Sequence, residues 1–312
     1  MRFPAILVVG FLAAPALSAQ YPVPSSGQWL IEPGDRSGKV QLNIRYGEGR
    51  HSSNWGRDVP LSELVGLSAT DMESGGAVHF KIVRSAGTLD CEGWFRGGKG
   101  SGHFTYQPNP DFVAELAKRG INAPTEWEQF QMTMAGVGLD LVDELKRQGY
   151  ERPTAGQLAR MGTHGVDLEY VRDIGARGYH LGDPESLVRM RDHGVNPEFI
   201  ESLDRAGYKN LAAEDLVRLR DHGVTGDYIA EMKALGYAPA DPEELVEARD
   251  HGVDPSYITS LKEAGYERLS LSELRRARDH GVTKTFIQRV KGRGYGALSL
   301  DEVIRLRDRG LD

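Results

Sequence analysis

Apolar and polar residues follow two different patterns along this chain, and the change comes near residue 108. Between residues 29 and 106 they alternate, as in Val40, Leu42 and Ile44 with a polar residue between each pair. Glycine-rich turns such as Gly75-Gly76 separate these runs. Alternation with a period of two between such turns predicts half-buried antiparallel strands. Residues 20–108 are therefore expected to form a small antiparallel β domain, either a sandwich or a partly open barrel.

From residue 109 onward, apolar residues instead recur at three- and four-residue spacings. In residues 196–224, Phe199, Ile200 and Leu203 form one apolar stripe, and Leu216 and Leu219 form a second. Such stripes are typical of short amphipathic helices that bury one face. This segment therefore predicts two helices, each of roughly ten residues, joined as an αα-hairpin.

The ends of the two helices are also marked in the sequence. Asn196 precedes Pro197, which is typical of a helix N-cap followed by the first helical position. Gly207 and Gly223 follow the two apolar stripes. Glycine ends helices because it accepts the left-handed backbone conformation without steric cost. We expect Gly207 to adopt that conformation.

This hairpin pattern repeats with a period of 29 residues. At that spacing Gly-Tyr recurs six times and His-Gly-Val five times. A fixed period of this size is typical of repeat proteins, in which each repeat buries its apolar face against its neighbours. The predicted first-helix N-caps extend the register to seven repeats: Asn109, Gly138, Asp167, Asn196, Thr225, Asp254 and Thr283. The chain is thus expected to be an α+β multidomain protein, with an all-α solenoid of seven αα-hairpin repeats over residues 109–312.

The first nineteen residues show a third pattern. Arg2 precedes an apolar run from Ala5 to Ala14, and small residues occupy positions 16, 18 and 19. This order is typical of a secretory signal peptide, and the apolar run is too short to span a membrane. We expect residues 1–19 to be removed on export to the periplasm or the cell exterior. The mature chain is not expected to insert into a membrane.

Composition excludes some classes of partner and site. The net charge is −7, and residues 20–108 carry nine basic and nine acidic side chains, so the excess of acidic residues lies in the helical part. An acidic surface is poorly suited to phosphate contacts, and no nucleic-acid partner is predicted. The single cysteine, Cys91, lies on the apolar face of a predicted strand. We expect it to be a core residue, since one cysteine cannot form an internal disulfide.

Charged residues near the ends of the second helices form one candidate binding surface. It consists of Arg191, Arg220, Arg249 and Arg278 with His193, His222, His251 and His280. Equivalent positions in packed hairpins should lie about 9–10 Å apart, too far for two imidazoles to share a zinc ion. We interpret the histidines as helix caps, because a helix C-terminus favours a cation. Each arginine is expected to pair with the aspartate of the next repeat or to form a solvated face. No metal ligand, cofactor or catalytic residue is predicted.

A second candidate lies in the β domain. The run from Gly93 to Gly100 resembles a phosphate-binding loop, but Gly100 replaces the required Ser or Thr and a strand follows, so a hairpin turn is expected. Trp94 falls on the strand face opposite Cys91 and is predicted to be exposed. Together with Trp29 and Trp55 it is a candidate lining for a small-ligand site. Packing of these tryptophans in the core is the alternative interpretation.

The repeat pattern carries a resemblance. Asn-Pro-Glu-Phe-Ile at residues 196–200, followed by Leu, Gly-Tyr, Leu and Arg-Asp-His-Gly-Val at 220–224, resembles short helical repeats of exported bacterial proteins. It is similar to the repeats that extend the periplasmic part of membrane metallopeptidases of the antibiotic-sensor type. The resemblance covers residues 109–312 and implies an exported bacterial module with a sensing or scaffolding role. The spanning helices and zinc motif of that family have no counterpart here, so it implies no peptidase activity.

Two functions from different classes follow. The first is a non-enzymatic scaffold or sensor module that binds a protein or peptide of the cell envelope on the solenoid surface. It would be a monomer or a weak end-to-end dimer. The second is a small-ligand or glycan-binding protein that uses the β domain, with the solenoid as a spacer. The first is favoured at this stage, because the sequence shows a long regular surface and no convergent polar site.

Overall fold

The computed structural model describes residues 23–34, 38–47 and 53–311, so the expected signal peptide over residues 1–19 lies outside the described residues. The chain divides into two compact units. The first, called the β unit here, contains the described residues up to Val83 together with Thr88–Pro108 and Thr125–Phe130. The second, called the helical unit, contains Arg84–Gly87, Asn109–Pro124 and the residues from Gln131 onward.

Seven strands form one curled antiparallel sheet in the order β3-β2-β1-β7-β6-β5-β4. Their bounds are β1 (Ser26–Pro33), β2 (Lys39–Tyr46), β3 (Ser53–Pro60), β4 (Leu64–Val65), β5 (Gly76–Arg84), β6 (Gly87–Arg96) and β7 (Lys99–Pro108). Two packed sheets, as in a sandwich, are not seen among the described strands. The described strands thus form a single curled sheet.

The core of the β unit lies on one face of this sheet. Alternation along β1 and β2 buries Trp29, Ile31 and Ile44, as the pattern of apolar residues predicts. The Trp29 ring packs 5.1 Å from that of Phe80, centre to centre, in an edge-to-face arrangement. Cys91 is also fully buried, and burial raises the pKa of its thiol to about 12. Cys91 is therefore the core residue that its strand position predicts.

Two short helical segments lie between β3 and β5. The 3₁₀ helix η2 (Leu61–Glu63) follows Pro60. Helix α1 (Ala69–Ser74) is not predicted by the apolar pattern. Its signal is a capping box, in which Ser68 accepts from the Asp71 backbone and Asp71 accepts from the Ser68 backbone. The spacing of Ser and Asp three residues apart is the feature that identifies such a start.

Fourteen helices follow in the described chain, each 8 to 10 residues long. They are α2 (Pro110–Lys118), α3 (Glu126–Ala135), α4 (Leu139–Arg147), α5 (Ala155–Thr163), α6 (Leu168–Ala176), α7 (Pro184–Asp192), α8 (Pro197–Ala206), α9 (Ala213–Asp221), α10 (Gly226–Ala234), α11 (Glu243–Asp250), α12 (Pro255–Glu263), α13 (Leu271–Asp279), α14 (Lys284–Gly292) and α15 (Leu300–Asp308). All seven predicted first-helix N-caps, from Asn109 to Thr283, occupy the N-cap position. Helix α11 has Pro242 as its N-cap.

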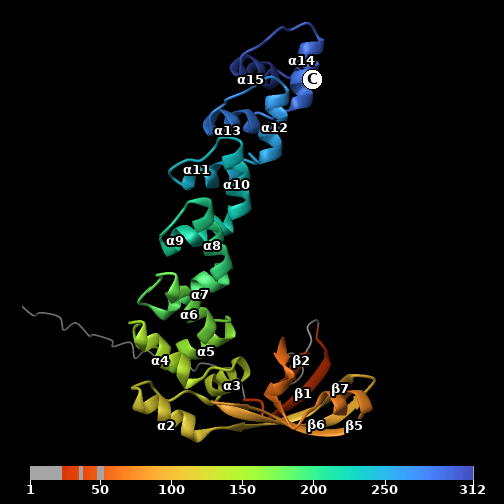
Figure 1. Cartoon of the computed structure of the whole chain (residues 1–312), viewed down its shortest axis with the longest axis vertical. Helices are drawn as coiled ribbons and strands as arrows, with labels where there is room; N and C mark the ends of the chain where they lie inside the picture. Colours follow the sequence, from red (N-terminus) through yellow and green to blue (C-terminus); the bar gives the residue numbers. More distant parts are fainter. Residues whose placement is uncertain (1–22, 35–37, 48–52, 312) are drawn as a thin grey trace, which may run out of the picture. The chain divides into compact units, whose positions relative to one another are not determined.

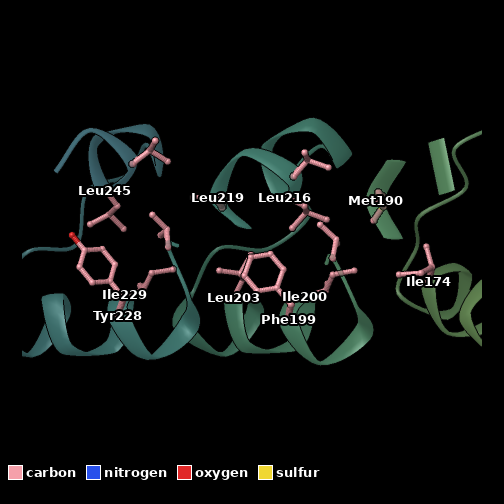
Figure 2. Close-up of a cluster of buried hydrophobic side chains, with 14 of the residues drawn as sticks. Ile174, Met190, Phe199, Ile200, Leu203, Leu216, Leu219, Tyr228, Ile229 and Leu245 are labelled. Carbon is pink, nitrogen blue, oxygen red and sulfur yellow. The ribbon is translucent and has the colours of Figure 1, made fainter. Parts of the chain in front are cut away.

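Within the helical unit, even-numbered helices pack against even-numbered helices and odd-numbered helices against odd-numbered ones. Each even-numbered helix from α2 to α12 contacts the next even one, and each odd-numbered helix from α5 to α11 contacts the next odd one (Figure 1). The apolar stripes meet between these two sets: in Figure 2, Ile200 and Leu203 of α8 face Leu216 of α9. Gly207 ends α8 with a φ of 107°, the predicted left-handed conformation. Among the described residues, no helix combines the length and the apolar character needed to cross a lipid bilayer.

Candidate functional site

The histidines of the first candidate surface bond to aspartates 28 residues later. In each pair the histidine Nδ1 lies 2.6–2.7 Å from the aspartate Oδ1. The pairs are His164–Asp192, His193–Asp221, His222–Asp250, His251–Asp279 and His280–Asp308. Each of these five histidines is also the C-cap residue of the helix that it follows, from His164 after α5 to His280 after α13. The histidines thus join the end of one odd-numbered helix to the end of the next.

The arginines of this surface lie over aromatic rings. The Arg191 guanidinium is 4.9 Å from the centre of the Tyr170 ring. Equivalent pairs are Arg220 with Phe199, Arg249 with Tyr228 and Arg278 with Tyr257, at 4.8–5.2 Å. The predicted pairing of each arginine with the aspartate of the next repeat is therefore wrong, because these aspartates bond to the histidines instead. The arginines instead make cation–π contacts within their own helix pairs.

A further column of ion pairs joins residues 25 apart on successive odd-numbered helices. Arg160 pairs with Glu185 at 3.0 Å, and Arg189 pairs with Glu214 at 2.8 Å. Arg218–Glu243 and Arg276–Asp301 are the equivalent pairs further along the chain. These side chains are partly or mostly exposed, so water screens each pair and its contribution to stability is small. Their joint effect is that many charges on the helical unit are already bonded to other charges of the same unit.

Buried tyrosines add a third set of bonds in the helical unit. The Tyr228 hydroxyl donates to the carbonyl oxygen of Val253 at 3.0 Å, and the Tyr257 hydroxyl donates to that of Val282 at 3.0 Å. Tyr170 makes the equivalent bond to Val195 at 2.9 Å. Burial raises the pKa of Tyr228 and of Tyr257 to about 12, above the ordinary value of 10.

These tyrosines predict a loss of stability at high pH. Between pH 10 and 12 the unfolded chain releases tyrosine protons that the folded chain keeps, so stability is fully present below about pH 10 and falls as the pH rises towards 12. We expect the urea midpoint, followed by circular dichroism at 222 nm, to be lower at pH 11.5 than at pH 9. The double variant Tyr228→Phe, Tyr257→Phe should lose less over the same interval. An equal loss in both proteins would contradict the assignment to these two hydroxyls.

The described ranges contain no group of three or more His, Cys, Asp or Glu side chains arranged to bind a metal ion. The way in which the five histidines pair explains why they do not form such a group. Each imidazole bonds to one carboxylate from the next odd-numbered helix, and the pairs recur once per helix pair rather than converging. The arginines and histidines of the candidate surface are therefore already bonded to other groups of the helical unit.

The β unit, in contrast, has a groove on the sheet face opposite its core. The groove has a volume of about 770 Å³ and is lined by β1, β2, β3, β6 and β7. Its outward-facing side chains are Gln28, Leu30, Asn43, Arg45, Asn54, Glu92, Trp94, Ser101 and His103. They occupy the outward-facing positions of the strand alternation and are polar, with Leu30 and Trp94 as the exceptions.

Strand register arranges these side chains in two rows across the sheet. In the first, called the polar row here, Arg45 lies opposite Asn54 and Gln28, and Gln28 lies opposite His103. The second, called the Trp94 row, contains Leu30 opposite both Asn43 and Ser101. The order across the strands is Asn54, Arg45, Gln28, His103, Glu92 in the polar row, and Asn43, Leu30, Ser101, Trp94 in the Trp94 row.

The last position of each row follows from two glycines. A Cβ placed on Gly102 would lie 2.6 Å from the Gly93 Cα, so these glycines are neighbours on β7 and β6. In an antiparallel pair this places Glu92 beside His103 and Trp94 beside Ser101. Both rows thus extend to β6.

A buried tryptophan forms the support beneath the groove. The Trp29 ring lies so close to the core side of β7 that a Cβ on Gly102 would be 2.7 Å from it. Its indole nitrogen donates to the backbone carbonyls of Glu92 at 3.2 Å and His103 at 3.1 Å. Trp29 therefore fixes the backbone of two polar-row residues, and only glycine at position 102 leaves room for it.

The side chains of both rows are free to bond to a ligand. Among the described residues, none of these polar or aromatic side chains forms a hydrogen bond, an ion pair or a ring contact with another protein group. Trp94 is 59% exposed and Leu30 is 42% exposed, which is unusual for such large apolar side chains. This separates the groove from the helical unit, where the charged columns are bonded internally.

The three candidate tryptophans have different places in the β unit. Trp94 lies in the groove and is exposed, as the alternation predicts. Trp29 is buried in the core, and Trp55 lies opposite Ile44 on the core side of the alternation. The polar row was not identified from the sequence, because its members come from five strands and only the register brings them together. No protein-family model, curated protein or solved structure matches this chain.

Proposed function

We propose that this chain is an exported, non-enzymatic binding protein whose β unit takes a small polar ligand or a glycan in the groove. The observation that carries this proposal is the convergence of unbonded polar side chains around an exposed tryptophan. Ligand sites commonly combine an apolar contact surface with a few polar groups that fix orientation. The candidate residues of the helical unit, such as Arg191 and His193, support the proposal less, because they are bonded within that unit.

In this proposal residues 109–312 are a solenoid of seven 29-residue αα-hairpin repeats that serves as a spacer or scaffold. The seven N-caps at constant spacing support it. The bonds that recur at separations of 28 and 25 residues also support it, since each kind of bond joins the same two repeat positions along the chain. Export rests on the signal-like pattern of residues 1–19. The repeats resemble those of exported bacterial proteins, which is consistent with a place in the cell envelope.

Replacing Trp94 with alanine should abolish ligand binding. We expect a ligand from a library of polar metabolites and oligosaccharides to raise the melting temperature of the mature protein, and Trp94→Ala to remove that shift. The reason is the loss of the exposed apolar contact in the groove. A matched control is Tyr295→Ala, which removes an exposed aromatic ring, 41% exposed, from the helical unit. Equal shifts in Trp94→Ala and in the parent protein would exclude the groove as the site.

A protein or peptide partner on the helical unit is the second candidate. It is favoured by shallow depressions that recur beside the Gly-Tyr loops, with volumes of about 220, 230 and 480 Å³. Two of them contain a tyrosine and a lysine from the following even-numbered helix, namely Tyr208 with Lys233 and Tyr237 with Lys262. We expect peptides selected from an array by the mature protein to bind less well to Lys233→Glu. Unchanged binding of every selected peptide would remove these depressions from the proposal.

A further inference from the structure

The length of the polar row suits an elongated ligand. Its five side chains come from five neighbouring strands, β3, β2, β1, β7 and β6. Neighbouring strands lie about 4.8 Å apart, so the row extends for roughly 19 Å across the sheet. A single small ring would contact only part of it. A chain of several linked rings would contact all five.

The chemistry of the row suits a ligand with many hydroxyl groups and no net charge. The Gln28 and Asn54 amides both donate and accept hydrogen bonds, Arg45 only donates, and ionised Glu92 only accepts. Because Arg45 and Glu92 carry opposite charges, the two offset each other. A phosphate or polyanionic ligand would favour several cations. An apolar ligand would strip water from five polar groups without replacing their hydrogen bonds, which is costly.

The Trp94 row supplies an apolar contact along one side of the polar row. Trp94 and Leu30 are the exposed apolar side chains in this row, and Ser101 lies between them. The face of a sugar ring carries C–H groups and is apolar, whereas its rim carries hydroxyl groups. A sugar ring can therefore stack on the Trp94 indole while its hydroxyls reach the adjacent polar row. Peptides and flat apolar molecules lack this combination of an apolar face and a fully polar rim.

From this arrangement we infer that the ligand of the groove is a neutral oligosaccharide, with one sugar ring stacked on Trp94 and the linked rings following the polar row. The inference rests on the proposed ligand-binding function and specifies its ligand class. A bound peptide is the less suitable occupant, because peptides that add to sheets pair with the backbone of an edge strand. The groove lies instead on a sheet face, where β1 and β7 have strand partners on both sides.

The test is isothermal titration of the mature protein with neutral tetrasaccharides, namely cellotetraose, maltotetraose and chitotetraose, and with glucose. We expect at least one tetrasaccharide to bind, and glucose to bind more weakly, because it covers less of the row. Trp94→Ala should weaken binding at least about tenfold, as expected for an aromatic residue that carries much of the contact. Gln28→Ala removes one hydrogen-bonding group and should weaken binding by about three- to tenfold. The control is Asp58→Ala, which changes an exposed β3 residue outside the groove lining.

The outcomes separate this inference from the proposed function. If no neutral tetrasaccharide binds, but a charged or smaller polar metabolite binds in a manner lost in Trp94→Ala, the oligosaccharide inference is overturned and the proposed function stands. If tetrasaccharides bind equally well to Trp94→Ala, the stacking arrangement is wrong. If no compound of either class shows binding that depends on Trp94, both the inference and the proposed function fail.

Discussion

Gly102→Ala is expected to unfold the β unit or to lower its free energy of unfolding by on the order of 3 kcal/mol. The added Cβ would overlap the carbonyl oxygen of Glu92 and lie 2.7 Å from the Trp29 ring. A flexible side chain could move away, but here the obstacle is the backbone of the neighbouring strand. The strands would have to separate, and Trp29 would lose its position under the groove.

Tryptophan fluorescence in a urea titration measures this effect for the β unit alone. All four tryptophans of the chain belong to that unit: Trp29, Trp55, Trp94 and Trp127. Circular dichroism at 222 nm in the same titration reports mainly on the helices. The control is Ser101→Ala, an exposed neighbour on β7 whose side chain lies on the other face of the sheet. A fluorescence midpoint for Gly102→Ala equal to that of Ser101→Ala would show that the close approach of β6, β7 and Trp29 is wrong.

In the helical unit, Ile229→Ala is expected to lower the free energy of unfolding by about 2–5 kcal/mol. Ile229 is 2% exposed and belongs to the buried apolar cluster of the helical unit, of which Figure 2 shows a part. Truncation removes buried apolar surface and leaves a cavity, because neighbouring helices can close the gap only in part. The large effect is expected since these short helices depend on packing against their neighbours for stability.

Urea titration followed at 222 nm checks this result. Glu231→Ala is the matched control on the same helix, since Glu231 is exposed and should change stability by no more than about 0.5 kcal/mol. The tryptophan transition of the β unit is an internal reference in both variants. If Ile229→Ala and Glu231→Ala had the same midpoint, Ile229 would not be a core residue of α10.

Much of the local structure could be predicted from the sequence because short-range chemistry determines it. The side-chain oxygen of Asn196 accepts from the Phe199 backbone, and Gly207 adopts the left-handed conformation, as their positions predict. The alternation of strand residues likewise identifies which face of β1 carries Trp29. In each case a residue acts on a backbone group within a few positions, or shares a face with its near neighbours.

Contacts between distant residues were harder to predict. Arg220 and Asp221 are adjacent in sequence, yet one lies over Phe199 and the other bonds to His193. The sequence shows that these arginines and aspartates each recur every 29 residues, but it does not show which side chains they contact. The polar row presents the same difficulty, since Asn54 and Glu92 share a groove only through the register of five strands. Sequence periodicity therefore predicts the helices and strands, whereas the contacts between distant side chains can be read only from the packed structure.

The side-chain bonds of the helical unit join residues at constant separations, and this has a consequence for how the length of the chain can change. Removing residues 196–224 would join Val195 to Thr225 and bring Asp250 to 28 positions after His193. Glu243 would likewise come to 25 positions after Arg189, and Pro255 would still follow Asp254 at a helix start. The His–Asp bonds and the Arg–Glu bonds would thus regain a partner of the same kind, whereas Arg177 would lose its pair with Glu201, because Ala230 takes that place. Loss or duplication of 29 residues can therefore shorten or lengthen this protein while keeping these two kinds of bond in register, whereas an insertion that is not a multiple of 29 residues would interrupt them.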